Sequence, residues 1–196
     1  GVLVLCENGV WVTQIAMSED TSVGSGDFSF HVLAEGVGCV HQRSVVQGRG
    51  MTAWMAPDGI YMYDGKSVQK ISDEIEDLWS GRRWHESPLF GGGDHVSSLG
   101  YPFVIQQGRM DRACGAFDAN RNCFMWAVPL SGYEDYNRLV LEYYVVTQSW
   151  SLHAPCPVTG GIGSTSLRPT NFASVYDRGK TRLLFSDYNT GVFGYN

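Results

Sequence analysis

The stretch MAPDGIYMYDGKSVQKISDEIEDLW, residues 55–79, contains the clearest local pattern in the chain. Two short turns, near Asp58 and Asp64, separate three short segments of strand-like composition. An Asp-Gly pair between such segments is typical of a tight β-hairpin, because both turn residues of that hairpin need a positive φ. We therefore expect Asp58 and Gly59 to form a hairpin turn.

The same hairpin pattern occurs three times in the chain. Each copy has an apolar strand, a short Asp or Asn turn that ends in Gly, then Val or Ile, and then a large aromatic residue. The copies are VLVLCENGVWVT near the start, AWMAPDGIYMY in the quoted stretch and LLFSDYNTGVFGYN at the end. Their glycines are Gly9, Gly59 and Gly191, and the aromatic residues are Trp11, Tyr61 and Phe193. A recurring hairpin of this kind predicts a repeat architecture.

A second pattern is shared by residues 113–129 and 173–186. In both segments an aromatic residue and an Asp, Asp118 or Asp177, end one strand, and another aromatic residue follows the Asp by eight positions. The first hairpin recurs after 50 residues and this pattern after 59. A unit of about 40 to 60 residues that holds a four-stranded sheet has the size of a propeller blade.

These repeats predict an all-β fold, namely a β-propeller or a propeller fragment of about four blades built from four-stranded antiparallel sheets. At 196 residues the chain has the size of one domain. We interpret residues 1–196 as a single β-propeller domain or as a segment of a longer propeller protein. Residues 138–146 and 148–153 are predicted to form the outer hairpin of the blade that begins at Ala113.

Helix is expected only from Asp73 to Trp79. Ser72 or Asp73 could cap the first amides of this helix, and Asp73 and Glu76 have the spacing of a capping box. Carboxylates early in a helix also suit the positive end of its dipole. The acidic group Asp73, Glu74, Glu76 and Asp77 therefore has a structural explanation, which we prefer to paired catalytic carboxylates.

Residues 80–112 are the longest stretch without clear periodicity, so we expect a long irregular insertion there. The insertion contains Arg82, Arg83, Trp84 and Arg109 and has no lysine. Guanidinium and large apolar groups are enriched where proteins meet, whereas lysine is depleted there. The sequence therefore predicts a candidate subunit interface at these four residues.

Composition excludes several classes of function. A formal net charge of −6 argues against a general nucleic-acid-binding protein, which needs a basic face. No apolar run reaches about 18 residues, so we expect no membrane span. The five cysteines are odd in number, lack a CxxC pair and are expected to be free buried thiols: Cys6, Cys39, Cys114, Cys123 and Cys156.

Several short motifs resemble reactive sites, but each fits a turn or a linker better. The GKT of residues 179–181 lacks the first glycine of a phosphate-binding loop and precedes a strand instead of a helix. Asp118, Asn120 and Asn122 begin like a calcium loop but lack its turn glycine and its closing carboxylate. The five histidines show no metal-ligand spacing. We therefore predict no catalytic, cofactor-binding or metal-binding residue, no cofactor and no enzymatic activity.

Residues 36–79, GVGCVHQRSVVQGRGMTAWMAPDGIYMYDGKSVQKISDEIEDLW, resemble a segment shared by β-propeller proteins of bacteriophage tails, especially hub or nozzle proteins of short-tailed phages. The matching positions are Gly38, Arg43, Ser44, Asp58, Gly59, Ile60, Tyr61, Asp64, Gly65, Ile71, Ser72, Ile75 and Trp79. Residues 116–129, AFDANRNCFMWAVP, resemble the next blade of those proteins. The departures are the insertion at residues 80–112 and a chain too short for a complete tail protein of this type.

The resemblance implies a viral structural protein located in the virion tail and assembled in the host cytoplasm. It also implies a homo-oligomer, with several copies in a ring around a channel through which DNA passes without specific binding. Other tail proteins and portal or adaptor proteins would be its neighbours. An acidic chain suits a channel in which DNA slides without sticking.

Two other functions remain open at this stage. The first is a propeller that binds or hydrolyses carbohydrate, with exposed Trp and Tyr side chains as sugar platforms. The second is a cellular interaction propeller. The positions of the six tryptophans discriminate the sugar site from the scaffold, because a concave cluster with carboxylates favours the sugar site and dispersal favours the scaffold.

Overall fold

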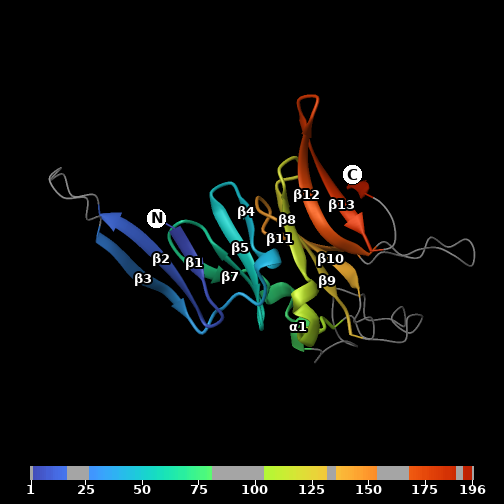
Figure 1. Ribbon diagram of the computed structural model, residues 1–196. Coiled ribbons are helices and arrows are strands. Elements are labelled where there is room, and N and C mark those ends of the chain that lie inside the picture. The colour runs from blue at the N-terminus through green and yellow to red at the C-terminus, as the bar shows by residue number, and fades with distance from the viewer. Residues whose placement is uncertain are drawn as a thin grey trace, which may run out of the picture.

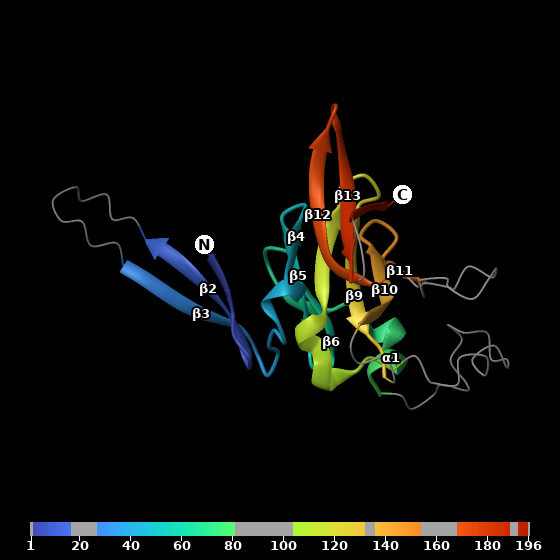
Figure 2. The same cartoon turned by 45° about the vertical axis from the view of Figure 1, so that its right-hand side comes forward.

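The computed structural model of the chain describes residues 2–16, 27–80, 104–131, 136–153, 168–188 and 192–195. These residues form four antiparallel sheets, and in each sheet the strands that follow one another in the chain lie side by side. The sheets stand in a row, from the N-terminal sheet at one end to the C-terminal sheet at the other (Figures 1 and 2). The all-β prediction is confirmed.

The outer two sheets have three strands each and the middle two have four, and they are numbered sheets 1 to 4 in chain order. Sheet 1 contains β1 (Val2–Leu5), β2 (Gly9–Ala16) and β3 (Asp27–Glu35), and sheet 2 contains β4 (Val46–Gly48), β5 (Met51–Ala56), β6 (Gly59–Tyr63) and β7 (Val68–Lys70). Sheet 3 contains β8 (Cys114–Asp118), β9 (Cys123–Pro129), β10 (Asn137–Tyr144) and β11 (Ser149–His153), and sheet 4 contains β12 (Pro169–Asp177), β13 (Lys180–Asp187) and β14 (Val192–Tyr195). The short helical elements are η1 (Gln42–Ser44), η2 (Asp73–Ile75), α1 (Asp77–Ser80) and η5 (Gln107–Arg112).

This arrangement corrects part of the predicted architecture. Four strands per sheet hold for sheets 2 and 3, and β10 with β11 is the predicted outer hairpin of the blade that begins near Ala113. Sheets 1 and 4 have three strands each among the described residues. Figures 1 and 2 show a row of sheets and no closed ring in this part of the chain.

Two of the hairpins turn on an Arg-Gly pair. Arg49 and Gly50 join β4 to β5 with φ angles of 53° and 77°, and Arg178 and Gly179 join β12 to β13 with φ angles of 50° and 82°. Positive φ at both turn residues gives a twist that matches the flanking antiparallel strands. The interpretation of residues 179–181 as part of a hairpin turn is therefore confirmed.

The predicted turn at Asp58 and Gly59 is wrong by one residue. Ala56 pairs with Gly59, so Pro57 and Asp58 are the two turn residues. Proline fixes a negative φ at the first turn position, which excludes the mirror-image turn that an Asp-Gly pair usually indicates. Gly59 begins β6, and a Cβ atom there would lie 2.4 Å from Ser72 Oγ. Close packing against Ser72, and not the predicted turn, explains the glycine at this position.

The first two predicted hairpin copies have the same register. β1 and β2 pair Leu5 with Val10, whereas β5 and β6 pair Met55 with Ile60, which is a shift of 50 residues in both strands. The same shift relates the remaining three pairs of β1 with β2 to pairs of β5 with β6. Gly191 of the third copy lies outside the described residues, and its hairpin joins β13 to β14, the second and third strands of sheet 4.

The second predicted pattern marks a different hairpin of the sheet. Asp118 ends β8 and Asp177 ends β12, which are the first strands of sheets 3 and 4. In both sheets the aromatic residue eight positions later, Trp126 or Phe185, lies in the second strand. This pattern therefore identifies the hairpin between the first and second strands of sheets 3 and 4.

The predicted helix from Asp73 to Trp79 is divided into η2 and α1, and α1 ends at Ser80. Ser72 precedes η2, but its side chain makes no capping hydrogen bond there. The Ser72 hydroxyl instead accepts a hydrogen bond of 2.9 Å from the buried amide of Ile60. An unpaired buried amide costs more than an exposed helix end that water can solvate, so the predicted cap by Ser72 does not form.

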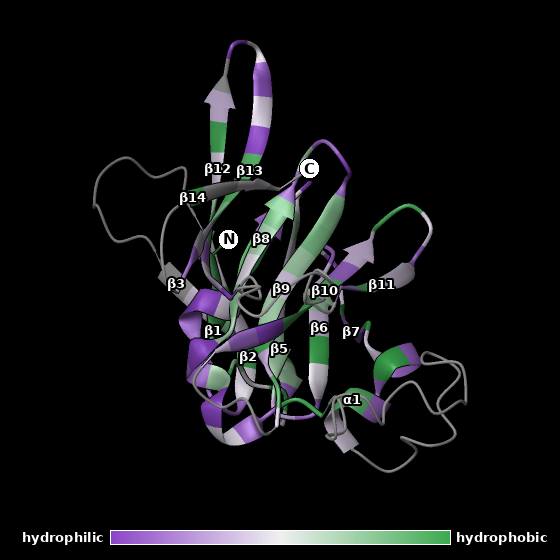
Figure 3. Ribbon diagram, turned by 90° about the vertical axis from the view of Figure 1, so that its right-hand side faces the viewer, coloured by the Kyte–Doolittle hydropathy of each residue, from purple (hydrophilic) through white to green (hydrophobic). Residues whose placement is uncertain are grey.

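Two hydrophobic cores join sheets 2, 3 and 4, and β9 contributes to both of them. All seven residues of β9 are buried, and the strand has predominantly hydrophobic colours in Figure 3. Phe124 and Trp126 belong to the core shared with sheet 2, whereas Met125 belongs to the core shared with sheet 4. A strand covered on both faces needs a continuous apolar sequence, which explains the run CFMWAVP.

Glycines allow the first strands of neighbouring sheets to approach closely. β4 packs against β8, and β8 packs against β12. A Cβ atom on Gly48 would lie 2.3 Å from the Phe117 ring, and one on Gly115 would lie 2.4 Å from Val46 Cγ2. β4 and β8 therefore each accept a side chain of the other strand at a glycine.

The predicted irregular insertion at residues 80–112 is ordered at its end. Residues 81–103 lie outside the described part of the chain. Ile105 forms a β-bridge with Leu130, and residues 107–112 form η5, which packs on β9. The buried side chain of Met110 fixes η5 to the first core.

Candidate functional site

Of the four predicted interface residues, only Arg109 can be placed. Arg82, Arg83 and Trp84 lie outside the described residues. Arg109 lies on η5 with 31% of its side chain exposed, and its Nε is 3.6 Å from Asp111 Oδ1. The side chain is therefore about one-third exposed beside a carboxylate, and the predicted interface stays a prediction.

The acidic group at the start of the short helices forms a solvated face. Asp73, Glu74 and Glu76 are exposed, whereas Ile75 between them is buried in the core. Lys70 Nζ lies 3.9 Å from Asp73 Oδ1 at the surface. This arrangement agrees with the structural interpretation of the acidic residues.

Sequence reasoning missed a buried polar cluster centred on Glu142, which is fully buried in β10. Arg121, in the turn after β8, donates hydrogen bonds from Nη2 to Glu142 Oε1 at 2.8 Å and from Nη1 to Oε2 at 3.2 Å. The Tyr144 hydroxyl donates to Oε2 at 2.9 Å, and His153 Nε2 lies 3.1 Å from the same oxygen. Arg121 Nε also donates to Asp118 Oδ2 at 2.9 Å. The cluster thus ties the first turn of sheet 3 to its third and fourth strands.

The pKa values in this cluster follow from burial and charge. Burial by itself would lower the pKa of Arg121, but its hydrogen bonds to Asp118 and Glu142 outweigh burial and raise it. The hydrogen bond to Glu142 and burial raise the pKa of Tyr144. Burial raises the pKa of the neighbouring Cys123 thiol to about 12. Because partners occupy both Glu142 oxygens, the geometry is that of a structural clamp and not of a general base.

One sequence signal could have located this cluster. Glu142 is the only charged residue in the otherwise apolar and aromatic run LVLEYYVV, residues 139–146. A carboxylate inside a buried strand needs a cationic partner. The sequence offers no way to choose Arg121, because that contact depends on how the turn after β8 folds over the sheet.

Residues 119–122 form a turn, as predicted. Asp118 Oδ1 accepts hydrogen bonds from the backbone amides of Asn120 at 2.9 Å and Arg121 at 3.3 Å. Asn122 has a φ of 55°, a conformation that asparagine tolerates better than most residues. Within the described ranges, no group of three or more His, Cys, Asp or Glu side chains could hold a metal ion.

The described tryptophans come from sheets 1, 2 and 3 and from α1, and Trp79, Trp126 and Trp150 pack in the first core. Trp11 is partly exposed on sheet 1, Trp54 and Trp126 are fully buried in sheets 2 and 3, and Trp79 is buried in α1. Trp126 Nε1 donates to Ser44 O and Trp150 Nε1 donates to Ile71 O, both at 2.8 Å. Sheet 3 is thereby attached to segments that flank the strands of sheet 2. Trp84 lies outside the described residues.

The four described cysteines are free, and their burial differs from the prediction. Cys114 and Cys123 are buried, but Cys39 is only partly buried and Cys6 is exposed. Cys6 lies in the turn after β1, on the poorly covered outer sheet, which explains its exposure. Cys156 lies outside the described residues.

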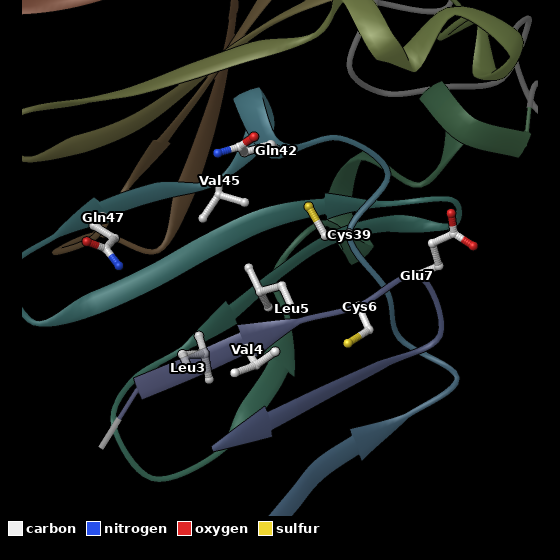
Figure 4. A pocket seen from close by; sticks show the side chains of 9 residues that line it. All are labelled: Leu3, Val4, Leu5, Cys6, Glu7, Cys39, Gln42, Val45 and Gln47. Carbon is white, nitrogen blue, oxygen red and sulfur yellow. The ribbon is translucent and has the colours of Figure 1, made fainter. Parts of the chain in front are cut away.

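A cleft of about 910 Å³ lies between the first strands of sheets 1 and 2 (Figure 4). Leu3 and Leu5 of β1 line one side of the cleft, and Val45 and Gln47 line the other. Glu7, in the turn after β1, lines it as well. The cleft is therefore mainly apolar, with a carboxylate beside the turn end of β1.

No protein-family model matches this chain, and no curated protein matches it. Within the described ranges, no helix has the length and the apolar character needed to cross a membrane.

Proposed function

We propose that this chain is a structural component of a bacteriophage virion tail, of the hub or nozzle type, and that its four sheets are blades of a β-propeller. The observation that carries this proposal is the arrangement of four consecutive antiparallel meanders in a row (Figure 1). Each meander is the size of a blade, and β4, β8 and β12 pack in series as the first strands of successive sheets.

The residues that carry the phage-tail resemblance have structural roles here. Ser44 Oγ donates to His41 O at 2.7 Å and accepts from the Met55 amide at 3.3 Å. A Cβ atom on Gly38 would lie 1.5 Å from the Glu7 carbonyl oxygen, so only glycine fits there. A motif made of such residues supports a shared scaffold more than a shared reaction.

The tryptophans argue against the carbohydrate alternative. A sugar platform needs exposed aromatic faces beside carboxylates. Trp54, Trp79 and Trp126 are instead buried between structural elements. These side chains act in packing, which fits the scaffold function.

The proposed partners are other copies of the chain in a ring, together with neighbouring tail, portal or adaptor proteins. DNA passes through the ring without specific binding, in keeping with the net charge of −6. The interface predicted at Arg82, Arg83, Trp84 and Arg109 belongs to this proposal.

The test is immunogold labelling of purified particles of a phage whose genome encodes this chain, with an antibody raised against the purified chain. We expect gold particles on the tail. Particles of a phage that lacks the gene are the control for antibody specificity. Labelling restricted to capsids, or unlabelled virions despite a positive immunoblot of the infected lysate, would contradict a tail location.

A further inference from the structure

The hairpins between the first and second strands of sheets 2, 3 and 4 point to one side of the molecule. Figures 1 and 2 show the ends of β4–β5, β8–β9 and β12–β13 on the same side, and β12–β13 reaches farthest. In the turn of β8–β9, Asn120 Nδ2 donates a hydrogen bond to Thr181 O near the end of β12–β13. These hairpin ends form one edge of the row of sheets, which we call the hairpin rim: residues 49–50, 119–122 and 177–182.

Two turns of the hairpin rim contain an arginine where asparagine, aspartate or glycine is usual. Arg49 and Arg178 are the first residues of two-residue turns, with φ angles of 53° and 50°. Most residues other than Asn, Asp and Gly adopt this conformation at an energetic cost. In the turn of sheet 3 the same conformation belongs to Asn122, with a φ of 55°. The backbone of the turn therefore does not explain the two arginines, and unfavourable conformations of this kind cluster at functional positions.

The hairpin rim is basic although the chain is acidic. Residues 177–182 contain three cations and one carboxylate, so their formal net charge is +2 and that of the rest of the chain is −8. The cations Arg178, Lys180 and Arg182 are exposed, and so is Arg49 in the turn of sheet 2. Lys180 and Arg182 are alternate residues of β13 and therefore lie on one face of the hairpin.

The base of β12–β13 holds its end in a fixed position. Phe172 of β12 and Phe185 of β13 are cross-strand partners that are buried in the core shared with sheet 3. Farther along the hairpin, Tyr176 is 75% exposed. The cations at the end of the hairpin thus stand on a strand pair that is anchored by its core. A preorganised element of this kind loses little conformational entropy when it binds a partner.

Duplex DNA matches the charge and the length of the hairpin rim. Stacked sheets are about 10 Å apart, so the turns of sheets 2 and 4, with sheet 3 between them, are about 20 Å apart. Duplex DNA carries about one negative charge per 1.7 Å of its axis, so about a dozen phosphates span this distance. Arginine and lysine contact phosphates without reading the bases.

A second copy of the chain fits the hairpin rim less well. Its exposed carboxylates Asp73, Glu74 and Glu76 form one small group around η2, and Lys70 Nζ lies 3.9 Å from Asp73 Oδ1. Such a group could face one hairpin end. The cations of the rim lie instead on sheets 2 and 4, with a third sheet between them, and this arrangement suits an extended polyanion.

We propose that the hairpin rim binds the phosphate backbone of duplex DNA, independently of base sequence, through Arg49, Arg178, Lys180 and Arg182. The choice of DNA as the polyanion rests on the virion function proposed above. The acidic remainder of the chain repels the duplex, so contact is limited to the rim. A few phosphate contacts give weak, salt-dependent binding that leaves the DNA able to move.

The experiment titrates a fluorescent duplex of about 20 base pairs, which is longer than the rim, with the full chain and follows anisotropy. Between about 50 and 200 mM salt, we expect saturable binding whose logarithmic salt dependence has a slope of about −3 to −4. A duplex of unrelated sequence should bind equally well. The double variant Arg49→Asn, Arg178→Asn should lower the slope to about −2 and weaken binding at about 50 mM salt by roughly tenfold.

Asparagine is chosen because it suits these turns better than arginine does, so the double variant should unfold in urea at the parent's midpoint or above it. Gln148→Asn is the matched control for the turn, because Gln148 has a φ of 51° in the β10–β11 turn and the change keeps the charge. Lys70→Gln is the control for charge, since Lys70 lies 3.8 Å from Asp58 in the turn at the other end of β5. Both controls should bind the duplex like the parent.

The proposal is overturned if the parent chain shows no saturable binding, or if the double variant keeps the parent's affinity and salt slope. It is also overturned if the chain self-associates, ignores the duplex and loses this association in the double variant, because another copy is then the partner. Immunogold labelling tests the virion function separately. Labelled tails without DNA binding would reject the rim contact alone, whereas DNA binding without labelled tails would keep the rim contact and reject the virion function.

Discussion

Glu142 is a fully buried carboxylate whose charge is balanced within its own sheet. Its partners are the Arg121 guanidinium, the Tyr144 hydroxyl and the His153 ring. A single buried charge in an apolar strand is costly, whereas a charge with several hydrogen-bonding partners can be retained. The stability of sheet 3 therefore depends on this cluster in addition to its apolar core.

Replacing Glu142 with glutamine should lower the free energy of unfolding by about 2 kcal/mol, because the change removes one of the two buried carboxylates that bind the Arg121 guanidinium and leaves it only Asp118. Urea unfolding followed by tryptophan fluorescence measures the effect. Glu35→Gln is the matched control on an exposed strand position and should change stability by less than about 0.5 kcal/mol. Equal stability of the two variants would show that the cluster contributes little.

Thiol reactivity should follow burial. Burial raises the pKa of Cys114 and Cys123 to about 12, so at pH 8 only about one thiol in ten thousand is ionised at either position. Cys6 is exposed. With an aromatic disulfide reagent at pH 8, Cys6→Ser should remove one equivalent of rapidly reacting thiol.

Cys123→Ser is the control for this measurement and should leave the number of rapidly reacting thiols unchanged. In a denaturant, both variants should lose one equivalent relative to the parent. A rapid phase that is smaller in Cys123→Ser than in Cys6→Ser would contradict the burial of Cys123.

At the scale of single elements, the sequence predicts hairpins better than it predicts their turns. The Asp-Gly pair at residues 58 and 59 located the hairpin of β5 and β6, but Pro57 moved the turn by one residue. The predicted helix cap is also absent, because the Ser72 hydroxyl accepts a hydrogen bond from the backbone amide of Ile60 in β6. The first error comes from the proline within the turn, and the second comes from a neighbouring strand that uses the Ser72 side chain.

The distances between sheets could not be predicted from the sequence. Nothing in the local pattern distinguishes Gly115, against which Val46 packs, from Gly108, where an added Cβ atom would have no neighbouring atom within 4 Å. The sequence also could not predict that Arg121 pairs with Glu142, because Arg121 lies in the turn after β8. Repeats identify the elements, whereas packing between elements depends on the three-dimensional arrangement.

Gly115→Ala should lower the free energy of unfolding by about 1 to 3 kcal/mol, because the new methyl group would lie 2.4 Å from Val46 Cγ2 and 3.0 Å from the Met125 carbonyl oxygen. Gly108→Ala is the matched control, because its methyl group meets open space. Chemical denaturation of both variants gives the comparison. The additional change Val46→Ala should recover part of the loss. If Gly115→Ala is as stable as Gly108→Ala, β4 and β8 are not in close contact.

At the scale of the whole molecule, the two ends of the row differ from its middle. Sheet 1 exposes Val2, Trp11, Phe30 and Val32, and the sheet 4 region exposes Val175, Tyr176, Tyr188 and Val192. In contrast, Val146 is the one large apolar side chain that is exposed on the described part of the middle sheets. Sheets 2, 3 and 4 bury their facing surfaces in two cores. The exposed apolar side chains of the two end sheets are therefore the surfaces on which another copy would pack.

The exposed apolar side chains of sheet 1 predict contact between copies of the chain. Phe30 and Val32 are alternate residues of β3 and lie on one face of sheet 1, where Val32 pairs with Trp11. Phe30 is 61% exposed, and its burial against another copy would contribute on the order of 2 kcal/mol. If copies associate end to end, the sedimentation coefficient of the chain should increase with concentration. The double variant Phe30→Ser, Val32→Thr should weaken this association by more than about tenfold.

Val146→Thr is the control for that measurement, because Val146 is 77% exposed on a turn of sheet 3, away from both ends of the row. It should associate like the parent, since removing an exposed methyl group from the middle leaves the end surfaces intact. The variants must also match the parent in urea unfolding, which separates a lost contact between copies from a loss of folding. If Val146→Thr weakens association as much as the double variant does, contact is made through the middle sheets, and a ring of end-to-end blades does not form.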